Sequence, residues 1–294
     1  MKKSSAFTII ELSAVLVVIG ILILGITKGV SLVEGSRIKS AQSFTIKSPV
    51  ADTEGLIAWY ESSMKESFKE GEALDGTQIS EWRDISPSSI VAQRNKLTRT
   101  ASSAVTYRFD GINKTPSVQF SGATTAKISL SAFYQGNLSQ ATVILVFRPN
   151  SAVLASTIFD GNSATTSVAL DPTFVTLNAG SSATTGTSNN AAAISSGGNY
   201  VLGAYLNGDQ AQVFINNTDT RIGVDTSDND PSGLLSIGNN AVSGINIGAN
   251  AGSSSAFNGL ISEVIIFNRP LKLQERKDIF RYLAKKYNIA VSGI

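Results

Sequence analysis

The chain has 294 residues, with no cysteine and no histidine. It therefore has no disulfides, thiolate nucleophiles or zinc–thiolate sites, and no imidazole base for a Ser-His-Asp or Cys-His arrangement. The formal charge is only +2, from 24 Lys+Arg and 22 Asp+Glu. Nucleic acid is not an expected partner, because binding it requires a basic footprint. The length fits one large domain or two small ones.

The N-terminal segment is the most informative part of the sequence. Between Phe7 and Thr27 the only charged side chain is Glu11, and the rest of the run is apolar. A run of about 20 apolar residues is long enough for a helix to cross a hydrocarbon core about 30 Å thick. A carboxylate in such a run is costly and usually has a functional partner.

Three interpretations of this segment remain open. A secretory signal peptide fits the basic start at Lys2 and Lys3, but no small-residue cleavage site follows Ile26. A plain single-pass anchor fits the length but leaves Glu11 unexplained. Cleavage between Ala6 and Phe7 would instead create an α-amino group four residues before Glu11, which supplies an opposite charge in an apolar setting.

Residues 2–25, KKSSAFTIIELSAVLVVIGILILG, resemble the N-terminal signature of type IV pilins and of the pseudopilins of type II secretion. The resemblance implies that residues 1–6 are a leader, that a prepilin peptidase cuts after Ala6, and that Phe7 becomes N-methylated. It also implies that Glu11 is the glutamate used in assembly. The family usually has glycine where Ala6 stands.

The helix is expected to continue beyond the apolar run. Val30, Val33, Ile38, Ala41 and Phe44 recur at the spacing of an amphipathic helix. Pro49 ends any helix that reaches it. We therefore expect one long helix over residues 7–44, membrane-spanning in part, and a linker over residues 45–53.

From residue 54 the pattern changes to short β-strands. Runs rich in Val, Ile, Phe and Tyr alternate with Gly/Asn/Asp turns, which favours a β-sandwich or barrel. The expected strands include 143–147, 200–206, 211–215 and 260–267. Residues 143–147 lack alternation, as in a strand buried on both faces, whereas 211–215 alternate. Residues 178–199 are expected to form a long loop or weak hairpin. A helix closes the chain over residues 270–289, with Ile279, Leu283 and Tyr287 on one face.

Five segments resemble the LamG-like jelly rolls of the concanavalin A-like lectin/glucanase superfamily: 55–63, 79–89, 115–122, 205–217 and 257–287. The resemblance implies two stacked antiparallel sheets over residues 54–290, with Trp59 and Trp82 in the core between them. The expected fold class is thus mainly β, a long N-terminal helix followed by a jelly-roll sandwich with a C-terminal helix. A carbohydrate or surface protein is the implied ligand.

Relatives on this fold include glycoside hydrolases, which carry their paired carboxylates on one strand. Residues 260–267 contain Glu263 alone, and the acidic stretch 66–75 has the composition of a loop. Hydrolysis of a glycosidic bond normally needs two carboxyl groups. We therefore predict that the domain is not an enzyme.

Calcium is the one inorganic ligand to consider, and no other cofactor is expected. Asp225, Asp228 and Asp230 form the densest acidic cluster, and residues 160–162 form a weaker Asp-Gly-Asn candidate. The cluster lacks the later bidentate glutamate and the flanking helices of an EF-hand. Both segments are interpreted as solvated turns, with calcium binding as the alternative.

Together these features predict a pilin-like subunit that displays a lectin-like domain for adhesion or recognition. The subunit would lie in the bacterial inner membrane before assembly and in an extracellular filament afterwards. Glu11 would pair with the Phe7 amine of an adjacent subunit. The alternatives are a type II secretion pseudopilin, a membrane-anchored lectin or adhesin that forms no filament, and an anchored glycanase.

Overall fold

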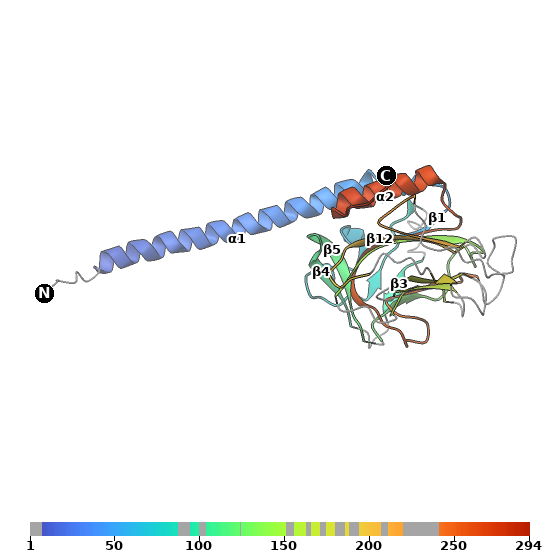
Figure 1. The fold of residues 1–294 in the computed structure, drawn as a ribbon. Helices are drawn as coiled ribbons and strands as arrows, with labels where there is room; N and C mark the ends of the chain where they lie inside the picture. Colours follow the sequence, from blue (N-terminus) through green and yellow to red (C-terminus); the bar gives the residue numbers. More distant parts are fainter. Residues whose placement is uncertain are drawn as a thin grey trace.

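A single long helix projects from a two-layer β-sandwich (Figure 1). This computed structural model describes residues 8–87, 95–99, 104–123, 125–150, 156–162, 166–170, 175–179, 186–187, 194–206, 211–219 and 241–294. Within those ranges, the side chains at 25–32, 34, 179 and 186–187 are not described.

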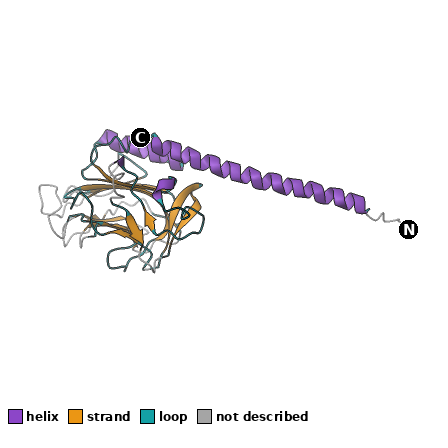
Figure 2. Ribbon diagram, turned by 180° about the vertical axis from the view of Figure 1, so that it is seen from behind, coloured by secondary structure: helices purple, strands orange, loops and turns teal. Residues whose placement is uncertain are grey.

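The helix α1 (Ile9–Ile46) has 38 residues and begins after the N-cap Thr8. Its observed bounds lie two residues from the predicted 7–44 at each end. It ends at Ile46, with Lys47 as the C-cap, and so stops before Pro49. The first turns extend away from the sandwich, and the last turns lie against it (Figure 2).

In the part of the chain that the structure describes, no helix is both long and apolar enough to cross a membrane. The prediction that α1 spans a membrane is therefore not supported.

Within the described ranges, the first sheet has seven strands in the order β13-β12-β7-β15-β5-β4, with β1 also paired to β15. Their bounds are β1 (Leu56–Glu61), β4 (Val105–Ile112), β5 (Thr115–Ser121), β7 (Ala141–Pro149), β12 (Tyr200–Leu206), β13 (Gln212–Ile215) and β15 (Asn258–Phe267). A 3₁₀ helix, η1 (Lys65–Ser67), follows β1.

The second sheet has eight strands in the part of the chain that the structure describes, in the order β11-β10-β9-β8-β14-β6-β3-β2. Their bounds are β2 (Glu81–Trp82), β3 (Leu97–Arg99), β6 (Ile128–Leu130), β8 (Ser156–Asp160), β9 (Thr166–Leu170), β10 (Val175–Ala179), β11 (Gly186–Thr187) and β14 (Ile245–Ile247). Every ladder between these strands is antiparallel. The prediction of a mainly β sandwich is confirmed.

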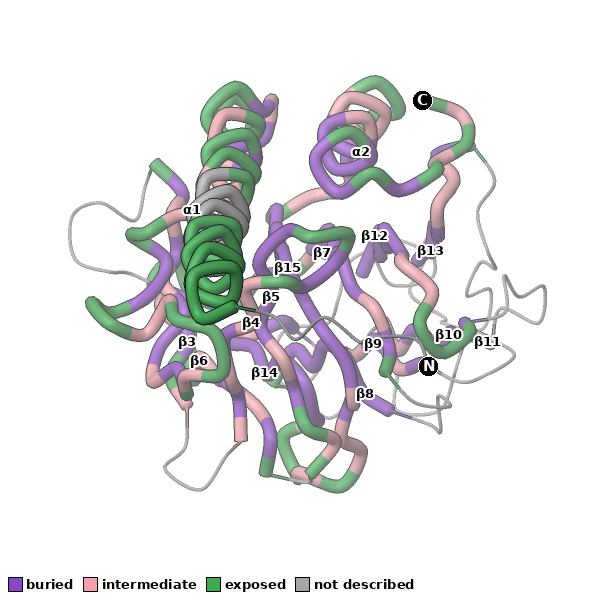
Figure 3. Tube along the Cα trace, turned by 90° about the vertical axis from the view of Figure 1, so that its left-hand side faces the viewer, coloured by how far each residue is buried: buried purple, intermediate pink, exposed green. Residues whose placement is uncertain are grey.

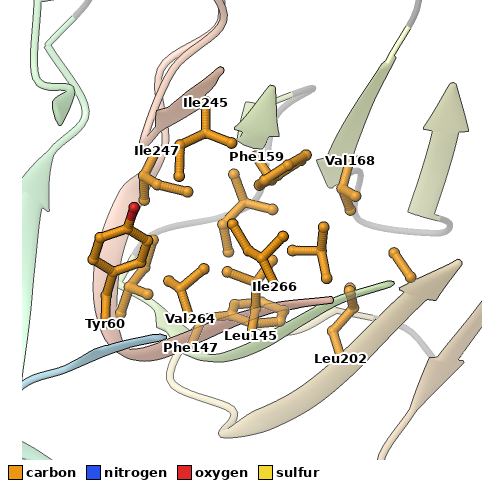
Figure 4. Close-up of a cluster of buried hydrophobic side chains, with 14 of the residues drawn as sticks. Tyr60, Leu145, Phe147, Phe159, Val168, Leu202, Ile245, Ile247, Val264 and Ile266 are labelled. Carbon is orange, nitrogen blue, oxygen red and sulfur yellow. The ribbon is translucent and has the colours of Figure 1, made fainter. Parts of the chain in front are cut away.

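The main core lies between the two sheets and combines aromatic and branched aliphatic side chains from both of them (Figure 4). Alternate residues of a strand point to opposite faces. Accordingly, Leu145 and Phe147 of β7 enter this core, while Ile144 and Val146 point to the other side. Burial on both faces explains why this strand lacks polar alternation, as predicted.

A second apolar cluster covers the outer face of the seven-stranded sheet. The helix α2 (Leu273–Tyr287) lies on this face, beside the last turns of α1 (Figure 3). Ile279, Leu283 and Tyr287 are buried there, which confirms the predicted face of α2. Phe214 of β13 joins this cluster while Val213 points into the main core, so the predicted alternation of this strand is also confirmed.

The two tryptophans lie on opposite faces of the seven-stranded sheet. Trp82 is fully buried between the sheets, with its ring 6.2 Å from that of Phe68. Trp59 is 4% exposed but belongs to the outer cluster beneath α2. The prediction that Trp82 lies in the core between the sheets is confirmed. The same prediction is wrong for Trp59, because adjacent residues of β1 point to opposite faces of the sheet and Trp59 points outward.

The serine- and glycine-rich stretch 178–199 falls only partly within the described residues. Its first residues end β10, and β10 pairs with β11 through Thr176–Thr187 and Leu177–Gly186. The described part is thus a short hairpin, which was one of the two predicted alternatives.

Candidate functional site

The N-terminal part of α1 exposes an unusual amount of apolar surface. Twelve large aliphatic side chains on residues 9–24, which we call the apolar stalk, are exposed: Ile9, Ile10, Leu12, Val15, Leu16, Val17, Val18, Ile19, Ile21, Leu22, Ile23 and Leu24. Ile9 is 87% exposed. Large exposed apolar patches mark sites of interaction with proteins or membranes.

Glu11 lies at the start of the apolar stalk and has a partner in its own chain. Its Oε2 accepts hydrogen bonds from Thr8 N at 2.8 Å and Thr8 Oγ1 at 2.9 Å, and its N–H donates to Thr8 Oγ1 at 3.3 Å. This reciprocal arrangement is a capping box, which satisfies two of the free N–H groups at a helix start. The Thr-x-x-Glu signal was readable in the sequence, but our sequence analysis missed it. Ala6 and Phe7 lie outside the described residues.

A buried charge cluster joins the two helices to the sandwich. It consists of Glu61 at the end of β1, Glu263 in β15 and Lys286 in the last turn of α2. Glu61 and Glu263 are directly opposite in the β1–β15 register. Lys286 Nζ lies 2.6 Å from Glu61 Oε1 and 2.9 Å from Glu263 Oε2, and none of the three side chains is exposed.

Glu263 accepts hydrogen bonds from three aromatic residues as well. Trp59 Nε1 donates to Oε1 at 2.7 Å, Tyr282 Oη donates to Oε1 at 2.8 Å, and Tyr287 Oη donates to Oε2 at 2.8 Å. Burial raises the pKa of Glu263, and the Lys286 ammonium opposes that shift. The pKa values of Tyr282 and Tyr287 are also raised, chiefly by burial.

Backbone groups and α1 complete the surroundings of the cluster. Ser63 N donates to Glu61 Oε1 and Met64 N donates to Glu61 Oε2, both at 2.8 Å. Lys286 Nζ donates to Thr45 Oγ1 in the last turns of α1 at 2.8 Å. The cluster therefore fixes the base of α1 against β1, β15 and α2.

The cluster contains a carboxylate pair that lies on two strands. Residues 260–267 carry Glu263 alone, and the strand register places Glu61 of β1 beside it. Glycosidase carboxylates must flank the scissile bond of a substrate, and these two have fully buried side chains. In the acidic stretch 66–75, Glu72 accepts from Ser80 Oγ at 2.6 Å and Asp75 accepts from Phe109 N at 2.9 Å, so both stabilise loops.

The described calcium candidate, residues 160–162, forms a turn. Asp160 Oδ1 accepts from Asn162 N at 2.8 Å and from Asn246 Nδ2 at 3.0 Å, and burial raises the pKa of Asp160. Asp225, Asp228 and Asp230 lie outside the described residues. Among the described residues, no three carboxylates gather as a metal site.

An apolar pocket of about 470 Å³ opens beside the base of α1. Its lining includes Thr45, Trp59 and Met64, together with Asp84. Asp84 Oδ1 accepts from Trp59 N at 2.8 Å and from Ser86 N at 2.9 Å. Burial raises the pKa of Asp84 to about 6, despite these hydrogen bonds.

A polar hollow of about 480 Å³ lies where the β4–β5 turn meets the end of α2. The polar and charged residues that line it are Asp110, Asn113, Lys114, Arg148 and Asn288. Asn113 Nδ2 donates to the Tyr287 carbonyl at 2.7 Å, which closes one wall. Amide and ionic groups of this kind can form hydrogen bonds to hydroxyl-rich ligands.

Comparison with known proteins identifies the fold and nothing finer. No family model and no curated protein matches the chain. Domain 4 of AbnA, a GH43 extracellular arabinanase from Geobacillus stearothermophilus determined in complex with arabinotriose, is 19% identical with a TM-score of 0.52. The alignment covers 76% of this chain and 97% of that domain.

Two other solved structures are similar at lower identity. Trypanosoma rangeli sialidase, in complex with 2,3-difluorosialic acid, is 12% identical with a TM-score of 0.53, over 87% of this chain and 39% of the sialidase. The binding domain of Paraclostridial Mosquitocidal Protein 1 is 14% identical with a TM-score of 0.52, over 79% of this chain and 52% of that domain. These similarities show that the chain shares the fold of these structures, and a shared fold does not establish a shared activity.

Proposed function

We propose that the chain is a pilin-like filament subunit that displays a lectin-like jelly-roll domain. One observation supports this above all others: the apolar stalk projects from the sandwich with twelve large aliphatic side chains exposed. Burying a single Val, Leu or Ile side chain stabilises a structure by about 1.5–3 kcal/mol. Packing of stalks from neighbouring copies would bury this surface, and a shared filament core is the arrangement that we propose.

The proposal includes processing by a prepilin peptidase between Ala6 and Phe7. Glu11 of one subunit would then pair with the methylated Phe7 amine of the next, in exchange for its capping contact with Thr8. The subunit would be held at the bacterial inner membrane before assembly and would lie in an extracellular filament afterwards. The chief alternative is a type II secretion pseudopilin, which would be processed in the same way.

The proposed role of the jelly roll is adhesion or recognition without catalysis. Its fold resembles that of a domain determined with arabinotriose, which supports a carbohydrate ligand, and a surface protein is the second candidate. The polar hollow is the described place best suited to sugar hydroxyls. Burial of Glu61 and Glu263 supports the absence of glycosidase activity, since a sugar cannot reach them.

Mass spectrometry of the mature N-terminus, combined with electron microscopy of the cell surface, tests the filament proposal. We expect a chain that starts at N-methylated Phe7 and surface filaments that contain it. A mature chain that retains Met1 would contradict the proposal and favour a plain anchor. Correct processing without extended filaments would favour the pseudopilin alternative.

A glycan-binding screen with intact filaments tests the lectin role independently. We expect binding that falls when Arg148 or Lys114 of the polar hollow is replaced by alanine. Replacement of Lys285, which is exposed but does not line the hollow, is the matched control. Filaments that bind no glycan would refute the carbohydrate role and leave the filament proposal unaffected.

A further inference from the structure

The buried charge cluster holds an amine and a carboxyl group in direct contact away from water. Lys286 Nζ and Glu61 Oε1 are 2.6 Å apart, and neither side chain is exposed. Because a carboxyl C–O bond is about 1.2 Å long, Nζ lies within about 4 Å of the Glu61 Cδ carbon. Reacting atoms in near-attack conformers are about 3–3.5 Å apart. Small side-chain movements would thus bring nitrogen and carbon to reacting distance.

The backbone around Glu61 suits a nucleophilic attack on its carboxyl carbon. Ser63 N and Met64 N each donate to a different Glu61 oxygen at 2.8 Å. Backbone N–H groups aimed at an oxygen that gains negative charge stabilise a tetrahedral intermediate. One of these N–H groups would therefore stabilise the oxygen of Glu61 that becomes the oxyanion, while the other bonds the oxygen that leaves.

Glu263 is placed to move protons during such a reaction. Its Oε2 is 2.9 Å from Lys286 Nζ, and hydrogen bonds from Trp59 and Tyr287 fix its orientation. Burial raises the pKa of Glu263, which favours the neutral acid. A neutral acid can give a proton to a leaving group and regain one from an amine.

We propose that Lys286 and Glu61 condense to form an intramolecular amide, an isopeptide bond between α2 and β1. The Lys286 ammonium first passes a proton to the Glu61 carboxylate. The neutral Nζ then attacks Cδ, an N–C bond forms, and one C–O bond breaks. Glu263 takes a proton from the nitrogen and gives one to the departing hydroxyl, so that one water leaves and Glu263 is regenerated. The reaction needs no oxidant, reductant or co-substrate.

Two residues that contact the cluster also line a neighbouring pocket. Trp59 and Thr45 bond to Glu263 and Lys286 respectively, and both also line the apolar pocket beside α1. The bond would link residues 225 positions apart. A covalent link across so long a segment restricts the unfolded chain, as a long-loop disulfide does, in a protein without cysteine.

Intact-mass measurement of the denatured full-length chain, purified in detergent, tests this proposal directly. We expect a mass lower by one water than the mature sequence requires, and a branched peptide that joins the segments containing Glu61 and Lys286. Lys286→Arg and Glu263→Gln should show the full mass, whereas the control Lys285→Arg should keep the loss. A wild-type chain at full mass, or a water loss mapped elsewhere, would overturn the proposal.

The wild-type measurement is decisive even where a variant does not fold. Glu61→Gln provides a second test. The Lys286 amine would then displace ammonia from the glutamine side chain and form the same amide bond. We expect this variant to reach the mass of the cross-linked wild type. A Glu61→Gln chain that folds, by near-ultraviolet circular dichroism, and yet keeps its full mass would overturn the role of residue 61 as the electrophile.

Discussion

Glu61 and Glu263 face each other across the β1–β15 ladder, and the single ammonium of Lys286 lies between them. Two buried carboxyl groups thus depend on one cation and on the surrounding N–H and O–H donors. Because Lys286 also donates to Thr45, the same cluster determines how the base of α1 is seated on the sandwich.

Replacing Lys286 by methionine should therefore destabilise the domain strongly. The change leaves two buried carboxyl groups without the Lys286 nitrogen and also removes the proposed amide link, and breaking a buried ion pair alone costs about 3–5 kcal/mol. Urea unfolding followed by circular dichroism measures the loss, and Lys285→Met, at an exposed neighbour, should change little. Adding Glu61→Gln to Lys286→Met should restore part of the stability, because one carboxyl group is removed. If it restores none, the uncompensated charge is not the cause.

The stability of the domain should depend on pH through Asp84. Burial raises the pKa of Asp84 from 3.8 to about 6, so the native state binds its proton up to a higher pH than the unfolded chain. The native state therefore loses stability as the pH rises from about 4 to about 6. Since each pKa unit is worth about 1.4 kcal/mol, the loss is about 3 kcal/mol.

Asp84→Asn isolates this effect, because asparagine keeps the oxygen that accepts from Trp59 N and Ser86 N. We expect the variant to match the wild type near pH 4 and to exceed it in unfolding free energy at pH 7. The exposed Asp110 gives the control variant Asp110→Asn. Parallel pH profiles for wild type and Asp84→Asn would contradict the prediction.

The two roles of Glu11 can be separated by changing its capping partner. If Glu11 acts in assembly, Glu11→Gln should remove most of the filament yield, while Thr8→Ala, which breaks the capping box alone, should leave most of it. Filament yield by electron microscopy and helix content by circular dichroism are the measurements. Equal losses for the two variants would mean that Glu11 serves the helix start and not the contact between subunits.

The close approach of α2 to the sheet depends on Gly203 of β12. A Cβ atom at this position would lie 3.1 Å from Cζ of Phe280, so a larger residue pushes the helix outward. We expect Gly203→Val to cost about 1–3 kcal/mol in unfolding free energy, the usual range for overpacking. Adding Phe280→Leu makes room and should recover part of the loss. An unchanged stability for Gly203→Val would show that α2 moves freely.

Much of the architecture could be predicted from local sequence patterns. The bounds of α1 follow from Thr8 and Pro49, and the buried face of α2 follows from the spacing of Ile279, Leu283 and Tyr287. The two-sided burial of β7 follows from its unbroken apolar run. These features depend on neighbours within a few residues, so their physical causes are visible in the chain itself.

The buried charge cluster could not be predicted in the same way. Glu61, Glu263 and Lys286 are far apart in the chain, and each one alone resembles an ordinary surface charge. Only the register of β1 against β15 places the two glutamates opposite each other. A shift of one residue would send every side chain of β1 to the other face, and Trp59 would exchange faces with its neighbours.

Local patterns in the chain specify the long N-terminal helix with its apolar stalk, the lone carboxylate of Glu11 near its start, and the mainly β character of the rest. Composition and short-range periodicity are sufficient for these. Only the packed fold seats α1 on α2 through Thr45 and brings three distant charges together in the protein interior. Such contacts depend on strand register and packing, which no local pattern specifies.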